Sequence, residues 1–218
     1  MPIDSFFDDR SQFNIERWDA LQRACNDLPD GCIMEIGCQR CGNLAWLASQ
    51  RFPDRICYGF DRFDAGMTAL GPKDMTESQS YHEGAGGASY ESCVQYVREA
   101  QQSFGGTEPG LIKGDVKDTF KIAGDLAPIA LAIVDLNLYE PTMVALLGVD
   151  WAVKQNEDYL SKMDHSYRPP FRGAWHYLAP GGVILVDDVG FPGIDAALAE
   201  SGLKWTMDGY FAVIRKSV

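Results

Sequence analysis

Positive charge is scarce in this sequence. Its 19 Lys and Arg residues stand against 31 Asp and Glu residues, which gives a formal net charge of −12 at pH 7. Binding to nucleic acid through phosphate contacts needs an excess of Lys and Arg that the chain does not have. An anionic membrane surface is disfavoured for the same reason. We therefore expect no nucleic-acid and no membrane partner, but a small molecule that is neutral or cationic.

Long apolar runs are absent as well. No stretch approaches the roughly 20 residues that cross a bilayer, and the first residues, MPIDSFFDDR, have neither the basic nor the apolar part of a signal peptide. A cytoplasmic enzyme is expected, with its six cysteines as free thiols. Cys38 and Cys41 form a C-x-x-C pair without a second such pair or a His pair at ligand spacing, so a metal or redox centre there is the less favoured alternative.

What the chain does contain is an alternation of short apolar runs and helical segments. Strands are expected at residues 32–37, 55–61, 110–113, 129–134 and 183–186, and helices at residues 43–52, 90–103, from 118 onward, 141–147 and 193–200. Strands that alternate with helices imply crossovers and a parallel sheet. Residues 203–207 and 210–215 predict a terminal antiparallel hairpin. The expected fold is a doubly wound, Rossmann-like α/β fold with a mostly parallel seven-stranded sheet.

The length of 218 residues predicts a single domain over residues 1–218. Apolar positions at helical spacing predict an N-terminal helix at residues 11–28. Residues 62–89 show little periodicity and much Gly, Ser and Thr, which is typical of a lid-like loop. Residues 149–172 are polar and form an insertion before the fifth strand. We expect both irregular segments to shape the ligand pocket.

Acidic side chains follow the strands. In an open α/β sheet, ligands bind beyond the carboxyl ends of the strands, near the point where the strand order reverses. Every expected parallel strand ends in or is followed by an acid at that edge, and together they are Glu35, Asp61, Asp115, Asp135, Asp187 and Asp188. A single acid at a strand end is weak evidence, because such ends face solvent. Six at one edge indicate a site.

The loop after the first strand indicates the kind of ligand. Gly37 and Gly42 provide places where the backbone can approach a ligand closely, but the G-x-G-x-x-G pattern of a dinucleotide cradle is missing. Glu35 would repel a pyrophosphate and attract an ammonium or a sulfonium. Asp61 is placed to accept hydrogen bonds from a ribose diol, and Asp115 or its neighbours to meet an adenine. S-adenosylmethionine has all of these features.

The remaining acids predict a metal site. Asp135, Asp187 and Asp188 come from two strand ends that we expect to be neighbours. Three carboxylates that converge repel one another unless a divalent cation lies among them, and hard oxygen ligands suit Mg²⁺. Such a metal would lower the pKa of a bound hydroxyl and orient it toward the methyl group.

Three segments, GDVKDTF, VDLNLYEPT and LAPGGVILVDDVG, resemble the macrocin O-methyltransferase-like family. This family belongs to the class I enzymes that use S-adenosylmethionine, and its members mostly methylate hydroxyls of sugars or natural products and require Mg²⁺. The resemblance implies that Glu35, Gly37 and Gly42 form the cofactor loop, that Asp61 binds the ribose, and that Asp135, Asp187 and Asp188 hold the metal. The chain departs from the family pattern at four positions: Cys41, Asn137, Leu138 and Pro141.

The sequence leaves more than one candidate for the general base and for the reaction class. Asp135 is one candidate base, and His82 in the lid-like loop is another, because its pKa lies near neutrality. The favoured function is a Mg²⁺-dependent O-methyltransferase for a small molecule. An N- or carboxyl-methyltransferase without a metal, a nicotinamide-dependent oxidoreductase and a non-catalytic cofactor-binding protein are the alternatives. The oligomeric state is not fixed by the sequence, and a homodimer is one alternative.

Overall fold

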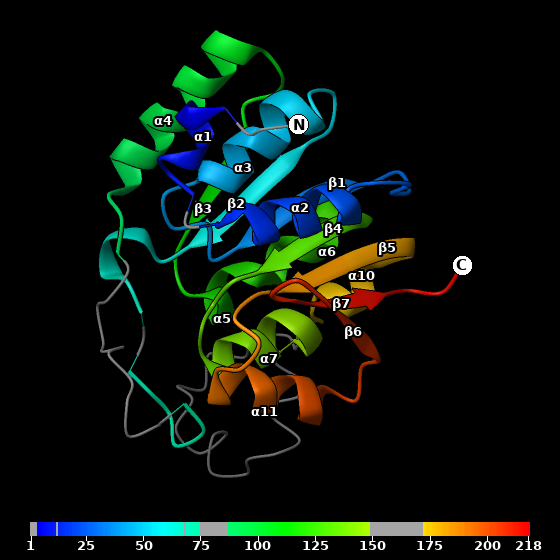
Figure 1. Ribbon diagram of the computed structural model, residues 1–218. Coiled ribbons are helices and arrows are strands. Elements are labelled where there is room, and N and C mark those ends of the chain that lie inside the picture. The colour runs from blue at the N-terminus through cyan, green and yellow to red at the C-terminus, as the bar shows by residue number, and fades with distance from the viewer. Residues whose placement is uncertain (1–3, 12, 68, 75–86, 149–171) are drawn as a thin grey trace.

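The computed structural model describes residues 4–11, 13–67, 69–74, 87–148 and 172–218. Within these residues, seven strands form one sheet in the order β3-β2-β1-β4-β5-β7-β6 (Figure 1). The parallel strands β1 to β5 continue into an antiparallel β6–β7 hairpin. The strands are β1 (Cys32–Ile36), β2 (Cys57–Asp61), β3 (Gly110–Lys113), β4 (Ile129–Val134), β5 (Leu178–Val186), β6 (Trp205–Asp208) and β7 (Phe211–Arg215). The predicted fold class is confirmed.

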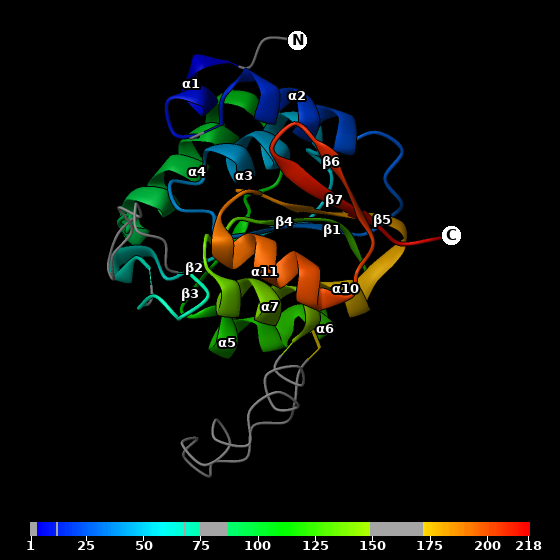
Figure 2. The same ribbon diagram turned by 60° about the horizontal axis from the view of Figure 1, so that its bottom comes forward.

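Helices cover both faces of the sheet (Figures 1 and 2). One face carries α1 (Ser5–Asp8), α2 (Ile15–Ala24), α3 (Gly42–Trp46) with the π-helical turn Leu47–Arg51 that continues it, and α4 (Tyr90–Phe104). The opposite face carries α5 (Val116–Thr119), the 3₁₀ turn Phe120–Ile122, α6 (Ala123–Leu126), α7 (Tyr139–Leu147), α10 (Ala174–Tyr177) and α11 (Pro192–Ser201). A further 3₁₀ turn, Phe63–Ala65, follows β2. No helix within the described ranges is long and apolar enough to cross a bilayer.

The central strands are buried on both sides, which explains their continuous apolar sequences. Ile33 of β1 packs into the core under α2 and α3, and its neighbour Met34 packs into the core under α7 and α11. Both side chains are fully buried. Burial of one such side chain stabilises a fold by about 1.5–3 kcal/mol. A parallel sheet that is covered on both faces therefore selects Val, Ile, Leu and Ala at nearly every position.

The N-terminal region differs from its prediction. Residues 11–28 were expected as one helix, but α2 begins at Ile15 and ends at Ala24, and a short helix that the sequence did not predict, α1, precedes it. The start of α2 is fixed by Asn14, whose side chain accepts a hydrogen bond from the backbone N–H of Arg17 at 3.0 Å. Side chains of this type compete with helical hydrogen bonding and end a periodic pattern.

Two further elements, the helix α5 and the strand β5, begin earlier than predicted. The helix expected from residue 118 onward begins at Val116, because Asp115 caps it by accepting from the N–H of Lys117 at 3.0 Å. The strand β5 begins at Leu178, before the expected residue 183. Residues 75–86 of the lid-like loop and residues 149–171 of the insertion lie outside the described residues.

The carboxyl edge of the sheet is kept in register past the ends of the strands. Gly37 after β1, Asp135 after β4 and Asp187 after β5 each donate a backbone hydrogen bond to the neighbouring strand, at 2.7, 2.8 and 3.0 Å. The strand order reverses between β1 and β4. The first residues beyond the strands therefore lie side by side at the switch point, where ligands of such folds bind.

Candidate functional site

A cavity of about 550 Å³ opens at this edge of the sheet. Its volume lies within the roughly 300–1,000 Å³ of small-molecule pockets. Five of the six strand-end acids line it, and two arginines lie among them. The charged lining residues are Asp61, Asp115, Asp135, Asp187, Asp188, Arg17 and Arg62, and the aromatic and apolar lining residues include Phe13, Met67, Leu138 and Phe191. The strand ends thus meet in one common cavity, as the sequence indicated.

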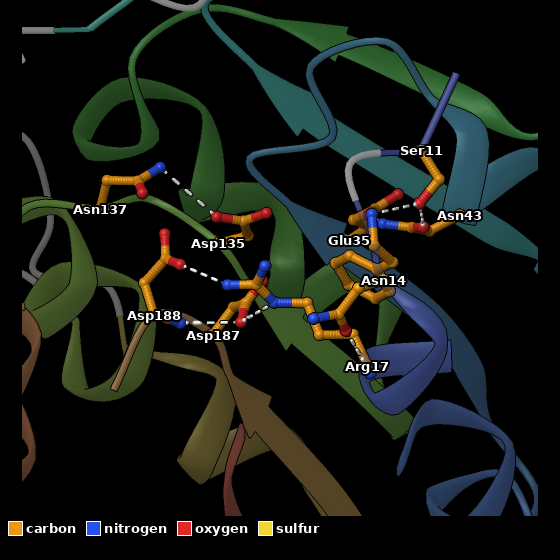
Figure 3. Close-up of polar contacts among 10 residues, drawn as sticks. Ser11, Asn14, Arg17, Glu35, Asn43, Asp135, Asn137, Asp187 and Asp188 are labelled. Atoms are coloured by element: carbon orange, nitrogen blue, oxygen red, sulfur yellow. Dashed lines mark hydrogen bonds and ion pairs between the residues drawn. The ribbon is translucent and has the colours of Figure 1, made fainter. Parts of the chain in front are cut away.

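Three carboxylates gather around the end of one arginine (Figure 3). Arg17 of α2 donates from Nε to Asp187 Oδ1 at 3.0 Å and from Nη2 to Asp188 Oδ1 at 2.7 Å. Asp135, at the end of β4, lies beside this pair in Figure 3. Asp187 is 3% exposed, so its charge has little contact with water. The acids predicted as metal ligands are therefore brought together, with a cation of the chain in contact with two of them.

The electrostatics of this group are dominated by burial and mutual repulsion. Burial raises the pKa of Asp135 well above its ordinary value, and the charges of Asp187 and Asp188 add to this effect. Burial together with the charge of Asp188 raises the pKa of Asp187 to about 6, although Arg17 acts in the opposite direction. One guanidinium therefore does not neutralise the three carboxyl groups, and further positive charge nearby would stabilise their ionised forms.

The backbone is strained on both sides of this group. Asp188 has a φ of 59° and Asn137 a φ of 61°, which is the left-handed region that non-glycine residues seldom adopt. In this conformation the N–H of Asp188 donates to Asp187 Oδ1 at 2.8 Å, and the amide of Asn137 donates to Asp135 Oδ1 at 3.4 Å. Such strain costs about 1–3 kcal/mol per residue and is concentrated at functional sites.

Gly37 and Asp61 shape the adjoining part of the cavity. Gly37 has a φ of +93°, and a Cβ at this position would overlap the backbone carbonyl of Asp135. Asp61 at the end of β2 accepts from the N–H of Gln39 at 2.8 Å and from the N–H of Phe63 at 2.5 Å. Burial raises its pKa, and these backbone hydrogen bonds oppose the rise. Asp61 thus anchors the loop after β1 and still faces the cavity.

Glu35 and Gly42 do not belong to the cavity lining. Glu35 is 1% exposed, its Oε1 accepts from the amide of Asn43 at 2.9 Å, and its Oε2 has no hydrogen-bond partner in the described part of the chain. Burial raises its pKa to about 8. A Cβ on Gly42 would meet the backbone of Arg10 and Ser11. The close approach at Gly42 is therefore to the N-terminal segment, and a cofactor contact of either residue stays a prediction.

The other predicted site residues have different outcomes. Asp115 lines the cavity, caps α5, and lies 4.0 Å from the guanidinium Nε of Arg62. His82 lies outside the described residues. No three His, Cys, Asp or Glu side chains in the described ranges are arranged so that they could hold a metal ion together.

The cysteines are free thiols, as expected, and all six are buried. The sulfur atoms of Cys38 and Cys41 lie 3.7 Å apart. Burial raises the pKa of Cys38 to about 12. A thiol with such a pKa carries almost no thiolate at neutral pH, and the thiolate is the reactive form. These groups are accordingly part of the core beneath the loop.

Several site residues were not predicted from the sequence. Arg17 lies 170 residues before Asp187 in the chain, and nothing in its own segment distinguishes it from a solvated helix arginine. Gln39 and Arg62 enter the cavity through loop geometry. Asn43 is buried and connects Glu35 with Ser11, whose hydroxyl donates to Asn43 Oδ1 at 2.6 Å. Only Asn43 could have been found from the sequence: it is an amide side chain near the start of the helix that follows Glu35.

Comparison with known proteins supports the fold. The chain resembles the O-methyltransferase NovP, with a TM-score of 0.67, 17% identity, and coverage of 96% of this chain and 83% of that one. It also resembles CalS11, a TDP-rhamnose 3'-O-methyltransferase in calicheamicin biosynthesis, with a TM-score of 0.55, 22% identity and coverage of 91% and 76%. The chain has the class I methyltransferase fold.

A third structure widens the range of proteins with this architecture. A putative rRNA methylase from Clostridium thermocellum has a TM-score of 0.52 and 12% identity, with coverage of 95% of this chain and 100% of that one. No family model matches the chain. No curated protein matches it either. The resemblance to the macrocin O-methyltransferase-like family therefore stays a prediction.

Proposed function

We propose that the protein is an S-adenosylmethionine-dependent, Mg²⁺-dependent O-methyltransferase that acts on a hydroxyl of a sugar or another small natural product. One observation carries this proposal: on a methyltransferase fold, the acidic strand ends meet in one cavity at the switch point. S-adenosylmethionine would supply the methyl group as an electrophile on a sulfonium. The residues of the chain would bind this cation, align the acceptor, exclude water and take up the proton of the hydroxyl.

The cofactor part of the cavity is built from Gly37 and Asp61. The missing side chain of Gly37 leaves room for close approach, and Asp61 keeps lone pairs free beyond its two backbone hydrogen bonds. Those lone pairs suit a ribose diol. The unpartnered Oε2 of Glu35, behind the loop, suits an ammonium group. Asp115, which lines the cavity, is proposed to meet the adenine.

The acceptor part is assigned to Asp135, Asp187 and Asp188. In the described residues these side chains surround the guanidinium of Arg17 and are not arranged to hold a metal ion together, so a metal site would form only when this group rearranges. Their oxygens are the hard donors that Mg²⁺ prefers. Burial is the main cause of their raised pKa values, and a divalent cation beside them would act in the opposite direction. A bound metal would lower the pKa of the acceptor hydroxyl. Asp135 is the proposed general base, because it lines the cavity in the same group of carboxylates that would hold the metal-bound hydroxyl.

The substrate class rests on charge and on the neighbours in structure. NovP and CalS11 are O-methyltransferases by their descriptions, and the second acts on a nucleotide sugar. A ribosomal RNA substrate, which the third neighbour suggests, fits a chain of net charge −12 poorly.

Calorimetry of S-adenosylmethionine binding tests the cofactor. The wild type should bind, and Asp61→Asn should lower the affinity by about tenfold or more, which corresponds to about 1.4 kcal/mol. Asp64→Asn is the matched control, since Asp64 follows three residues later, is exposed, and does not line the cavity. Absence of binding to the wild type would remove the proposal.

A metal-free methyltransferase for nitrogen or carboxyl acceptors is the second candidate, because Arg17 already supplies a cation to Asp187 and Asp188. Methyl transfer to a panel of small hydroxyl, amine and carboxyl acceptors should be measured with and without a chelator. Loss of transfer in the chelator supports the first candidate, and unchanged transfer supports the second. A non-catalytic cofactor-binding protein would bind the cofactor without turnover.

A further inference from the structure

Arg17 is the feature of the cavity that the proposed function does not explain. Its guanidinium contacts Asp187 at 3.0 Å and Asp188 at 2.7 Å, and these two carboxylates are proposed metal ligands. Figure 3 shows the side chains of Asp135, Asp187 and Asp188 around the end of Arg17. Burial acts to lower the pKa of Arg17, but the three carboxylates outweigh burial and raise it. The guanidinium of Arg17 therefore occupies the position where a metal cation is expected.

The charge balance favours exchange of this cation for a divalent one. A guanidinium carries one positive charge and contacts two of the three carboxylates through directed hydrogen bonds. The two hydrogen bonds of Arg17 go to Asp187 and Asp188, and Asp135 receives none from it. A divalent cation would contribute twice the charge at shorter distance to hard oxygen atoms. Arg17 holds one oxygen of each of the two carboxylates, and a metal that takes these oxygens as ligands competes with the guanidinium for them.

The exchange requires only a movement of the side chain. The helix α2 is held in the core by Trp18, which is 2% exposed, and by Leu21, which is fully buried. Its other end is tied to the β6–β7 hairpin by the ion pair of Arg23 with Asp208 at 2.5 Å. The side chain of Arg17 is 20% exposed, and its guanidinium carbon lies 4.9 Å from the ring centre of Tyr210. A rotation toward this ring and the solvent would free both carboxylates while the helix stays in place.

We propose that Arg17 is a built-in counter-cation of the group formed by Asp135, Asp187 and Asp188, and that it competes with a divalent metal for these carboxylates. The metal binds as the guanidinium leaves, so Arg17 sets the metal affinity of the free protein. This inference takes from the proposed function only the assignment of the metal to these carboxylates. Its test measures metal binding and needs no methyl transfer.

Titration with Mn²⁺, followed by electron paramagnetic resonance of the free ion, measures this competition. Arg17→Ala should bind Mn²⁺ about tenfold or more tightly than the wild type, because two charge-assisted hydrogen bonds no longer oppose the metal. Arg17→Lys should lie between them, since a lysine keeps the charge but cannot contact both carboxylates through a rigid fork. Arg23→Ala, on the same helix and away from the cavity, is the matched control and should bind like the wild type.

Two results would overturn the proposal. Equal or weaker Mn²⁺ binding by Arg17→Ala would show that Arg17 does not compete, and absence of binding in both proteins would show that the three carboxylates hold no metal even when the guanidinium is removed. Binding of S-adenosylmethionine without metal is measured in parallel. Its absence in the wild type would contradict the proposed function, whatever the metal titration shows.

A measurement on the wild type covers the case in which Arg17→Ala does not fold. The Nε–H of Arg17 donates to a carboxylate, so its proton should give a protected arginine signal in ¹⁵N-resolved NMR spectra. Addition of Mg²⁺ should move this signal to the position of a solvated arginine. An unchanged signal at a Mg²⁺ concentration that saturates the protein would refute the exchange.

Discussion

Burial of Glu35 should make the stability of the protein depend on pH, and Glu35→Gln should remove this dependence. Burial raises the pKa of Glu35 from an ordinary 4.5 to about 8 in the folded chain. The folded state therefore binds a proton that the unfolded state has released over this interval. The contribution of Glu35 to stability is fully present below about pH 4.5 and is lost as the pH rises to about 8.

The size of the effect follows from the difference between the two pKa values. One pKa unit corresponds to about 1.4 kcal/mol, so the wild type should lose on the order of 4–5 kcal/mol relative to Glu35→Gln between about pH 4 and pH 9. Glutamine has nearly the shape of the protonated acid, and its amide oxygen can still accept from Asn43. The two proteins should be about equally stable at the acidic end, and the variant should be the more stable one at the alkaline end.

Urea denaturation followed by circular dichroism over this pH range measures the difference. Asp135 and Asp187 titrate in both proteins, so most of their effect cancels in the comparison, and their charge coupling to Glu35 is smaller than the effect of burial. Glu16→Gln, which removes an exposed carboxylate from α2, controls for the change in net charge. A difference between wild type and Glu35→Gln that stays constant within about 0.5 kcal/mol across the range would refute the reasoning.

Two substitutions test the loop after β1 and the start of α7. Gly37→Ala should destabilise the fold by about 3 kcal/mol or more, because its methyl group would overlap the carbonyl of Asp135; Gly190→Ala, at a similar φ but in open space, should cost only about 1 kcal/mol in the same urea titration. Asp74→Ala should cost about 1 kcal/mol and speed hydrogen exchange at the N–H of Tyr139, which Asp74 accepts at 2.6 Å. Equal losses for the two glycines, or unchanged exchange, would contradict these contacts.

The fold was predictable because its signals are local. The strand β4 is an uninterrupted buried apolar run, β5 ends in one at residues 183–186, and β1 is apolar except at Glu35. Turn residues separate the runs. The hairpin at Asp208-Gly209 has an equally local signal. The boundaries that moved depend on side-chain capping: Asn14 shortens the first predicted helix, and Asp115 starts the helix after β3 earlier than apolar spacing indicates.

The site was predictable in part. The acids at the strand ends share one edge by topology, so Asp61, Asp135 and Asp187 could be assigned to a common cavity from the strand order alone. The place of Glu35 behind that cavity depends on the path of the N-terminal segment. The ion pair of Arg17 joins residues that lie 170 positions apart in the sequence, and neither segment has a pattern that predicts it.

The pairing of Arg17 with Asp187 also has a consequence for synthesis of the chain. The arginine leaves the ribosome 170 residues before its partner, and the partner follows β5, a central strand of the sheet. A nascent chain that stops short of this strand has the helix and the glycine loop but no carboxylate pair to complete them. The cavity is therefore completed only after β5 has been synthesised, and a ligand specific for it would not recognise a chain that stops before this strand.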